Sequence, residues 1–459
     1  MQPLLAIAWL TWKAAFRFRL FLVVAVLLLG CVVGLPLLIK DDGTARGFTQ
    51  ILLTYTLSTI TALLGLSTLW LACGMLARDI EDCTLQVVAT KPVARWQIWL
   101  GKWLGIMSLN AALLALSGVS VYGLLQWRAT RLSAPEQNIL YHEVLVARGS
   151  AKPPSLDKQI QAEADRLLRE RLQKNPELRA DLVEARRQVV EQIKAEHQIV
   201  PPGYAHQWKI DLGAARGIER GQPIQLRLKF NAADKSLSGT YNGGLWVGVP
   251  RQTPFSYQEV TSLAPDTYHE FEIPANYDDQ GVLTVTFGNA NNIALLFPLK
   301  DGVEVLYPQG SFGLNFARGL GVIFCWMALL ATLGLAAASF LSFPVAAFLS
   351  LAVLTLALSS GSIANVVEEG TLMGFNSETS QMGQSPVDVV AIPFFRGVLE
   401  LINFAKDFSP IDSLSTGRSV SWAELGRAFG QIVVLLGGAI GAAGIFIFTR
   451  RELATAQTQ

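Results

Sequence analysis

Few side chains in this sequence stand at the spacing that a known catalytic motif requires. Gly101-Lys102 looks like the end of a phosphate-binding loop, G-x-x-x-x-G-K-[ST], but Trp96 stands in place of the first glycine and Trp103 in place of the final hydroxyl residue. His142-Glu143 begins like the zinc-protease motif H-E-x-x-H, but Val146 replaces the second histidine. No G-x-S-x-G nucleophile motif occurs. The chain is therefore expected not to be an enzyme.

A charged island at 77–102 is the stretch most typical of a binding function. It lies between two apolar runs, 51–76 and 103–125, each longer than the ~20 residues that a helix needs to cross a bilayer. The island is therefore expected to be a loop at one membrane face. Apolar side chains at helical spacing predict a short amphipathic helix over 79–90, which ends before Pro92 because a proline restricts the residue that precedes it.

Tryptophans and basic residues alternate in the second half of this island. Trp96, Trp99 and Trp103 are interleaved with Arg95 and Lys102. Tryptophan prefers the headgroup level of a membrane, and lysine and arginine collect in cytoplasmic loops. One interpretation is therefore an ordinary interfacial loop that lipid contacts stabilise.

The order of residues in the island also resembles the cytoplasmic coupling loop of ABC-2 type transporter permeases. The shared pattern is an acidic turn, T-L-x-x-V, K-P-V-x-R and then G-K at the foot of the next span, with Cys83 as a departure from it. The resemblance extends to Thr11–Arg19 and Phe448–Glu452 but does not cover 128–313. It implies that the loop docks into a cleft on a separate ATPase subunit, which binds ATP and Mg²⁺, so that this chain binds no cofactor directly. The expected coupling residues are Asp79, Glu81, Asp82, Thr84, Leu85, Lys91, Pro92, Arg95 and Lys102.

Composition narrows the class of protein. The chain has 459 residues, of which 51% are hydrophobic and 16% charged, too apolar for a simple soluble enzyme. A formal net charge of +1 argues against a nucleic-acid partner, which would require a basic domain. The 4 cysteines form no C-x-x-C pair and the 4 histidines are scattered, so neither a disulfide framework nor a metal site is expected.

The apolar runs predict an α-helical polytopic membrane protein with six transmembrane helices. The expected spans are 20–39, 51–76, 103–125, 315–340, 345–363 and 429–449. A further apolar run at 389–404 contains Pro393, Arg396 and Glu400, and a central charge costs ~2.5–3.5 kcal/mol on the insertion scale. A re-entrant or interfacial pair of helices is therefore preferred there over a crossing, although both remain open.

An inserted extracytoplasmic domain is expected between the third and fourth spans. Residues 128–203 predict a helical hairpin, with helices at about 156–173 and 176–197, because charged residues alternate there with recurring apolar ones. Residues 204–312 predict a β-sandwich, because short alternating runs are separated by turn residues. The expected strands are Gln222–Phe230, Gly243–Val249, Tyr268–Ile273, Gly281–Phe287 and Gly302–Tyr307.

Charge asymmetry predicts the orientation of the chain. Basic residues of the start, of the island and of the tail fall on one side of a six-span arrangement, which the positive-inside rule places in the cytoplasm of a bacterial inner membrane, with both termini. The expected parts are an interfacial amphipathic helix (1–19), spans one to three (20–127), the hairpin (128–203), the sandwich (204–312), spans four and five (313–364), an extracytoplasmic and re-entrant segment (365–428), and span six with the tail (429–459).

The resemblance implies the permease subunit of an ATP-driven exporter. Its expected partners are an ABC ATPase subunit, a second permease (an identical copy or a sister chain) and membrane lipids. The near absence of ionisable residues in the spans weakens a proton-coupled carrier. An alternative is a membrane-anchored assembly or signalling protein, whose extracytoplasmic domain holds a protein partner and which translocates no cargo. A third alternative, a membrane-bound hydrolase, rests only on the size of that domain. The substrate stays open.

Overall fold

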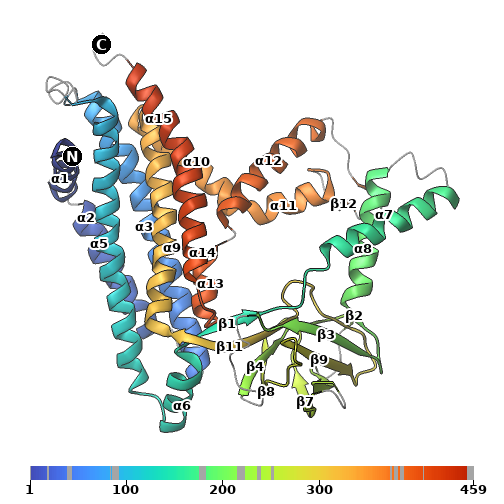
Figure 1. Ribbon diagram of the computed structural model, residues 1–459. Helices are drawn as coiled ribbons and strands as arrows, with labels where there is room; N and C mark the ends of the chain where they lie inside the picture. Colours follow the sequence, from blue (N-terminus) through green and yellow to red (C-terminus); the bar gives the residue numbers. More distant parts are fainter. Residues whose placement is uncertain are drawn as a thin grey trace. The chain divides into compact units, whose positions relative to one another are not determined.

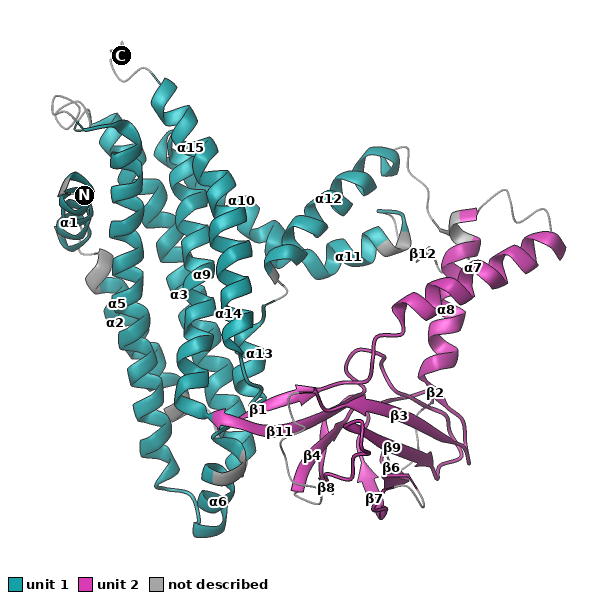
Figure 2. Ribbon diagram, viewed as in Figure 1, with its two compact units in different colours: residues 1–146, 311–459 teal, residues 147–310 magenta. Residues whose placement is uncertain are grey.

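The computed structural model describes residues 2–17, 20–38, 44–82, 84, 93–174, 182–213, 223–234, 239–249, 253–372, 375–376, 381–382, 387–406 and 408–451. The chain forms two compact units, one from residues 1–146 and 311–459 and the other from residues 147–310 (Figure 2). The first unit is largely helical and the second contains the large sheets (Figure 1). The expected helical protein with an inserted β-rich region is thereby confirmed at this level.

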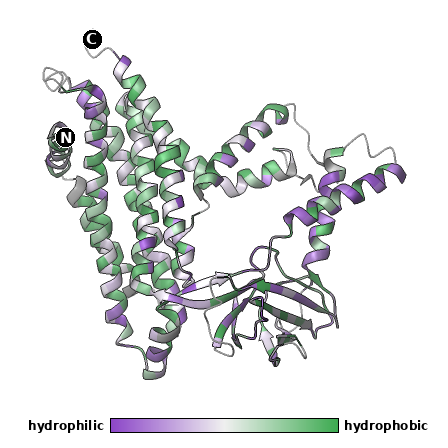
Figure 3. Ribbon diagram, viewed as in Figure 1, coloured by the Kyte–Doolittle hydropathy of each residue, from purple (hydrophilic) through white to green (hydrophobic). Residues whose placement is uncertain are grey.

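Long apolar helices dominate the first unit. Within the described residues, four of them are long and apolar enough to cross a membrane, and they are green along much of their length in Figure 3. They are α3 (Ala45–Glu81), α5 (Arg95–Ala129), α9 (Phe312–Ala338) and the continuous helix Trp422–Arg450, which comprises α14 (Trp422–Ala428), η4 (Phe429–Gly437) and α15 (Gly438–Arg450). The first three cover the second, third and fourth expected spans, and the last covers the sixth. The prediction of a membrane-embedded protein is confirmed in this coarse sense.

The first and fifth expected spans have a different character. α2 (Leu20–Leu38) contains the apolar stretch Val23–Leu35, which is shorter than the four long helices. α10 (Phe343–Leu358) and α11 (Ser360–Glu369) are bent by 60° at their junction and together make a fifth candidate span. The described residues thus contain four candidate spans, or five, and a sixth crossing stays a prediction.

Glycines allow close packing at several helix contacts of this unit. A Cβ atom at Gly105 of α5 would lie 2.5 Å from the Cβ of Thr11 in α1 (Gln2–Arg17). A Cβ at Gly334 of α9 would lie 2.7 Å from the Cβ of Ala72 in α3. Small residues let helices approach closely in membranes. By contrast, a Cβ added at Gly30 or Gly34 of α2 would meet no described atom within 4 Å.

The segment before the final helix contains shorter elements. Residues 389–404 lie within α12 (Asp388–Lys406), which packs against α11 and holds Pro393 inside it. Among the described residues, α12 is not one of the helices long and apolar enough to span. Next come α13 (Pro410–Ser415) and then α14, where the Ser421 hydroxyl caps the helix by accepting the Glu424 N–H at 3.0 Å. The remaining elements of this unit are α6 (Ala134–Ile139), η1 (Leu140–Val144), β12 (Phe375–Asn376) and β13 (Gln381–Met382).

The second unit is built on two four-stranded sheets. One has the order β1-β11-β4-β8 and the other β3-β9-β6-β7. Their buried apolar side chains form one common core, for example Leu226 from the first sheet and Leu245 and Val285 from the second. The strands are β1 (Val146–Ala151), β3 (Ala205–Asp211), β4 (Pro223–Leu228), β6 (Tyr241–Val247), β7 (Ser256–Leu263), β8 (His269–Pro274), β9 (Val282–Asn289) and β11 (Val303–Ser311). A small third sheet pairs β2 (Ile199–Val200), β10 (Leu295–Leu296) and β5 (Asn231–Ala232).

A helical hairpin follows the first strand of the sandwich. α7 (Asp157–Lys174) and α8 (Leu182–Gln198) are polar outside, as their purple colour in Figure 3 shows. They share a small apolar core that includes Ile160 and Val189. Because β1 precedes the hairpin and pairs with β11, the hairpin is an insertion within the sandwich.

Candidate functional site

The predicted coupling loop is shorter than 77–102. α3 continues through Glu81 and α5 begins at Arg95, so both ends of the charged island are helical. The described ends of the island thus extend the neighbouring helices, and the predicted coupling role of this segment stays a prediction. Three coupling residues (Leu85, Lys91 and Pro92) lie outside the described residues, as does most of the helix predicted at 79–90.

Lys102 joins the end of α3 to the start of α5. Its side chain is 9% exposed, and its ammonium group forms an ion pair with the carboxylate of Asp79. The same group donates a hydrogen bond to the Met75 carbonyl oxygen at 2.9 Å. A buried charge needs such partners, since an unpaired one is strongly unfavourable. Lys102 therefore positions two helices and is not available to a partner protein.

Glu81 joins the end of α3 to the start of α10. Its carboxylate accepts the backbone N–H of Phe343 at 2.9 Å, where a negative charge is favourable because the first N–H groups of a helix lack partners within it. The guanidinium of Arg78 lies 4.6 Å from the centre of the Phe343 ring, and Trp70 meets that ring edge-to-face at 5.1 Å. Three side chains of α3 thus hold the first turn of α10.

Arg95 joins the start of α5 to the end of α15. Its guanidinium donates to the carbonyl oxygens of Thr449 at 2.8 Å and Arg451 at 2.7 Å. The last carbonyl groups of a helix lack partners within it, and a positive charge there is favourable. Arg451 in turn donates to the carbonyl oxygen of Ser339, at the end of α9, at 3.1 Å. We call these interhelical contacts, made by Asp79, Glu81, Arg95, Lys102 and Arg451, the end clamp.

The two other described coupling residues remain at the surface. Asp82 directly follows α3 and is exposed. Thr84 is also exposed, and its hydroxyl donates to the Asp79 carbonyl oxygen at 3.2 Å. The described part of the predicted site therefore divides into residues that bond to a neighbouring helix (Asp79, Glu81, Arg95 and Lys102) and residues that do not (Asp82 and Thr84).

Trp99 is buried among the helices of the first unit. It is only 2% exposed and its ring lies beside Gly441 and Gly444 of α15. Trp103 donates its indole N–H to the Thr332 hydroxyl of α9 at 2.9 Å. Both rings therefore link α5 to other helices, and the glycines near Trp99 are the sequence signal that indicates such packing.

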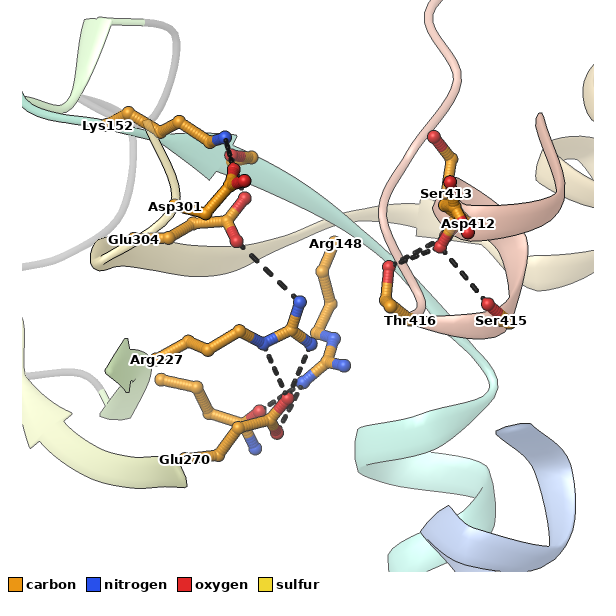
Figure 4. A network of polar contacts seen from close by, with 12 residues as sticks. Arg148, Lys152, Arg227, Glu270, Asp301, Glu304, Asp412, Ser413, Ser415 and Thr416 are labelled. Carbon is orange, nitrogen blue, oxygen red and sulfur yellow. Dashed lines mark hydrogen bonds and ion pairs between the residues drawn. The ribbon is translucent and has the colours of Figure 1, made fainter. Parts of the chain in front are cut away.

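A ladder of four charged side chains crosses one sheet of the second unit and was not predicted (Figure 4). Arg148, Glu304, Arg227 and Glu270 come from β1, β11, β4 and β8, which are neighbours in that order, so the charges alternate. Arg227 donates to Glu270 at 2.6 Å and lies 3.6 Å from Glu304, while Arg148 lies 3.1 Å from Glu270. The alternation of charges becomes apparent only when β4 is paired with β8 and β11, because the four residues are far apart in the sequence.

The charges of the ladder compensate one another. Burial raises the pKa of Glu270, but the positive charges of Arg148 and Arg227 and the hydrogen bonds from both outweigh burial, so its pKa lies below the ordinary 4.5. A carboxylate held ionised between two guanidinium groups stabilises a sheet and is poorly suited to accept a proton in catalysis. The described residues contain no group of three or more His, Cys, Asp or Glu that could hold a metal ion.

Comparison of the chain with protein-family models, curated proteins and solved structures gave no match.

Proposed function

We propose that this chain is the permease subunit of an ATP-driven ABC-2 type exporter in a bacterial inner membrane. The observation that carries the proposal is the end clamp. It ties α3, α5, α9, α10 and α15 together beside the segment whose sequence resembles a coupling loop. A separate ATPase subunit would bind this segment from the cytoplasm, and a second permease would complete the assembly as an identical copy or a sister chain.

The end clamp suits a mechanical role. In its hydrogen bonds, Lys102, Arg95 and Arg451 act as charged donors and Glu81 acts as a charged acceptor. Hydrogen bonds that involve an ionised group are about twice as strong as those between neutral groups. A push on the segment between α3 and α5 would therefore move several helices together. Asp82 and Thr84, together with Leu85, Lys91 and Pro92, are assigned to contact with the ATPase, whereas Asp79, Glu81, Arg95 and Lys102 transmit the movement.

Six spans and cytoplasmic termini belong to the same proposal. The bent pair α10–α11 and the apolar α2 would supply the fifth and first crossings. The positive-inside rule then places the second unit outside the cytoplasm.

Co-purification tests the proposal. The chain is isolated in a mild detergent from the membranes of its native host, and an ABC ATPase subunit is sought among the proteins retained with it. We expect the ATPase to be retained by the wild type and lost, by about tenfold or more, in Asp82→Lys, because a reversed rim charge disfavours association. Glu170→Lys, an exposed change on α7, is the matched control and should retain it. A wild type that never retains an ATPase contradicts the proposal.

A second candidate function follows from the size of the second unit, residues 147–310. A membrane-anchored assembly or signalling protein would use this unit to hold a protein partner, with ATP hydrolysis changing its shape and no cargo crossing. ATP-dependent movement of a labelled solute in proteoliposomes that contain both subunits would exclude this alternative.

A further inference from the structure

Two aromatic rings lie side by side on the outer face of the sheet β3-β9-β6-β7. Leu245 and Val247 point into the core, so Trp246 between them lies on the opposite face. Tyr257 of the edge strand β7 is the direct cross-strand neighbour of Trp246 and is 56% exposed. The ring centres are 5.2 Å apart and the ring planes are inclined by 38°. The two rings therefore form a shallow, bent surface.

Two glycines form the floor beneath the indole ring. Gly244 of β6 and Gly288 of β9 are paired across the two strands. A Cβ atom would lie 2.8 Å from the Trp246 ring if added at Gly244 and 2.6 Å from it if added at Gly288. Both distances are too short for a real side chain, so the ring position requires glycine in both strands. Trp246 thus lies across the backbone and keeps partial exposure to solvent.

Polar side chains surround the rings on the same face. Gln207 is paired with Thr286, which is paired with Trp246, and Glu259 is paired with Gly244. The side chains of Gln207, Glu259 and the nearby Lys209 are exposed, and none of them hydrogen-bonds or pairs with another described residue. Asp211, two residues after Lys209 on β3, is exposed on the same face, so this face carries one positive and two negative charges. Gln207, Lys209 and Glu259 therefore offer free donors and acceptors on a face that is weakly acidic.

We propose that this surface, the aromatic platform (Trp246, Tyr257, Gly244 and Gly288, with Gln207 and Glu259 at the rim), binds a neutral carbohydrate. One face of a pyranose ring presents polarised C–H groups, which the electron-rich face of an aromatic ring attracts. Its hydroxyl groups project sideways, where amide and carboxylate groups can donate and accept hydrogen bonds. The platform matches both requirements at once.

Charge and shape disfavour other ligands. A nucleic acid would need a basic stripe, and one lysine does not supply it. A membrane surface would need a contiguous apolar patch, but polar side chains interrupt this face. A proline-rich peptide binds in a groove lined by aromatic rings, and it is included in the test as the competing class. The proposal goes beyond the proposed function and holds whether or not the chain is a permease.

The test uses the full-length protein in lipid nanodiscs, because detergents with sugar headgroups would compete. Cellohexaose, chitohexaose, maltohexaose and a polyproline peptide are titrated by calorimetry. We expect at least one oligosaccharide to bind and Trp246→Ala to weaken its binding by about tenfold or more. Tyr204→Ala, which removes a 68% exposed tyrosine of the same unit outside the platform, should leave affinity within about twofold.

Two further variants separate binding from folding. Tyr257→Ala removes the more exposed ring. Gly288→Ala keeps both rings, but its added Cβ displaces the indole ring of Trp246 from the backbone of β9. Both should weaken binding, while circular dichroism shows an intact β-rich unit. The proposal is overturned if no oligosaccharide binds, if folded Tyr257→Ala and Gly288→Ala bind as the wild type does, or if only the polyproline peptide binds.

Discussion

At the scale of single residues, Glu270 shows how one carboxylate couples the stability of the β-rich unit to pH. Its pKa is lowered in the folded chain, so the folded state binds this proton less readily than the unfolded state. Its contribution is complete above the ordinary value of 4.5 and is lost as the pH falls through the lower, folded pKa. Acid should therefore weaken the sheet that carries the ladder.

Replacement of this carboxylate tests that reasoning. Glu270→Gln should lower the free energy of unfolding at about pH 7 by roughly 3 kcal/mol, because it leaves two buried guanidinium groups without their shared partner. It should also flatten the loss of melting temperature below pH 4.5. Differential scanning fluorimetry of the full-length protein measures both effects. Glu272→Gln, an exposed change on the same strand, is the control, and equal behaviour of the two variants would refute the argument.

At the scale of elements, close helix packing depends on particular glycines. α1 meets α5 where Gly101 and Gly105 face Ile7 and Thr11. Gly105→Leu should therefore destabilise this contact by about 1–3 kcal/mol, since a larger side chain overpacks it. Hydrogen exchange should show faster exchange in 3–16. Gly123→Leu on the same helix, where an added Cβ meets no described atom within 4 Å, should leave exchange there unchanged.

A second prediction at this scale concerns the end clamp. Arg95→Gln removes a charged donor from the last carbonyl groups of α15, and hydrogen bonds to charged groups contribute about 1.5–3 kcal/mol. The final turn of α15 should fray, which faster hydrogen exchange over 446–450 would report. Arg450→Gln, which among the described residues loses a contact between its guanidinium and the Phe446 ring, should have a smaller effect. Unchanged exchange in Arg95→Gln would show that the contact does not hold this helix end.

At the scale of the whole molecule, the proposed function requires a particular orientation in the membrane. In a chain whose native cysteines (Cys31, Cys73, Cys83 and Cys325) are replaced, Asp82→Cys should react with an impermeant maleimide only after the cells are opened. Glu170→Cys should react on intact cells, because the second unit is proposed to lie outside the cytoplasm. Labelling of Asp82→Cys on intact cells would place the coupling segment beyond the reach of a cytoplasmic ATPase.

Local patterns in the sequence were sufficient to predict many of the helices and strands. The apolar run at 51–76 lies within α3, all but the last two residues of the run at 315–340 lie within α9, and all but the first residue of the alternating run at Gly281–Phe287 lie within β9. Such patterns report which face of an element is apolar, and this depends on residues close in sequence. Strands β1, β3 and β7 were not predicted. The ends of α3 and α5 also differ from the predicted span ends, because charged residues at those ends are stabilised by partners elsewhere in the chain.

The sequence by itself determined that apolar helices alternate with a polar insert, since hydrophobic runs and turn residues act locally. Only the tertiary structure decided which side chains meet. Arg95 bonds to a carbonyl group 354 positions later in the chain, and Glu270 meets Arg148 across 122 positions. Trp246 likewise finds its floor only when β6 pairs with β9. These contacts depend on side-chain packing and on strand register. Both result from many small interaction energies between residues far apart in the sequence, so no local sequence pattern indicates them.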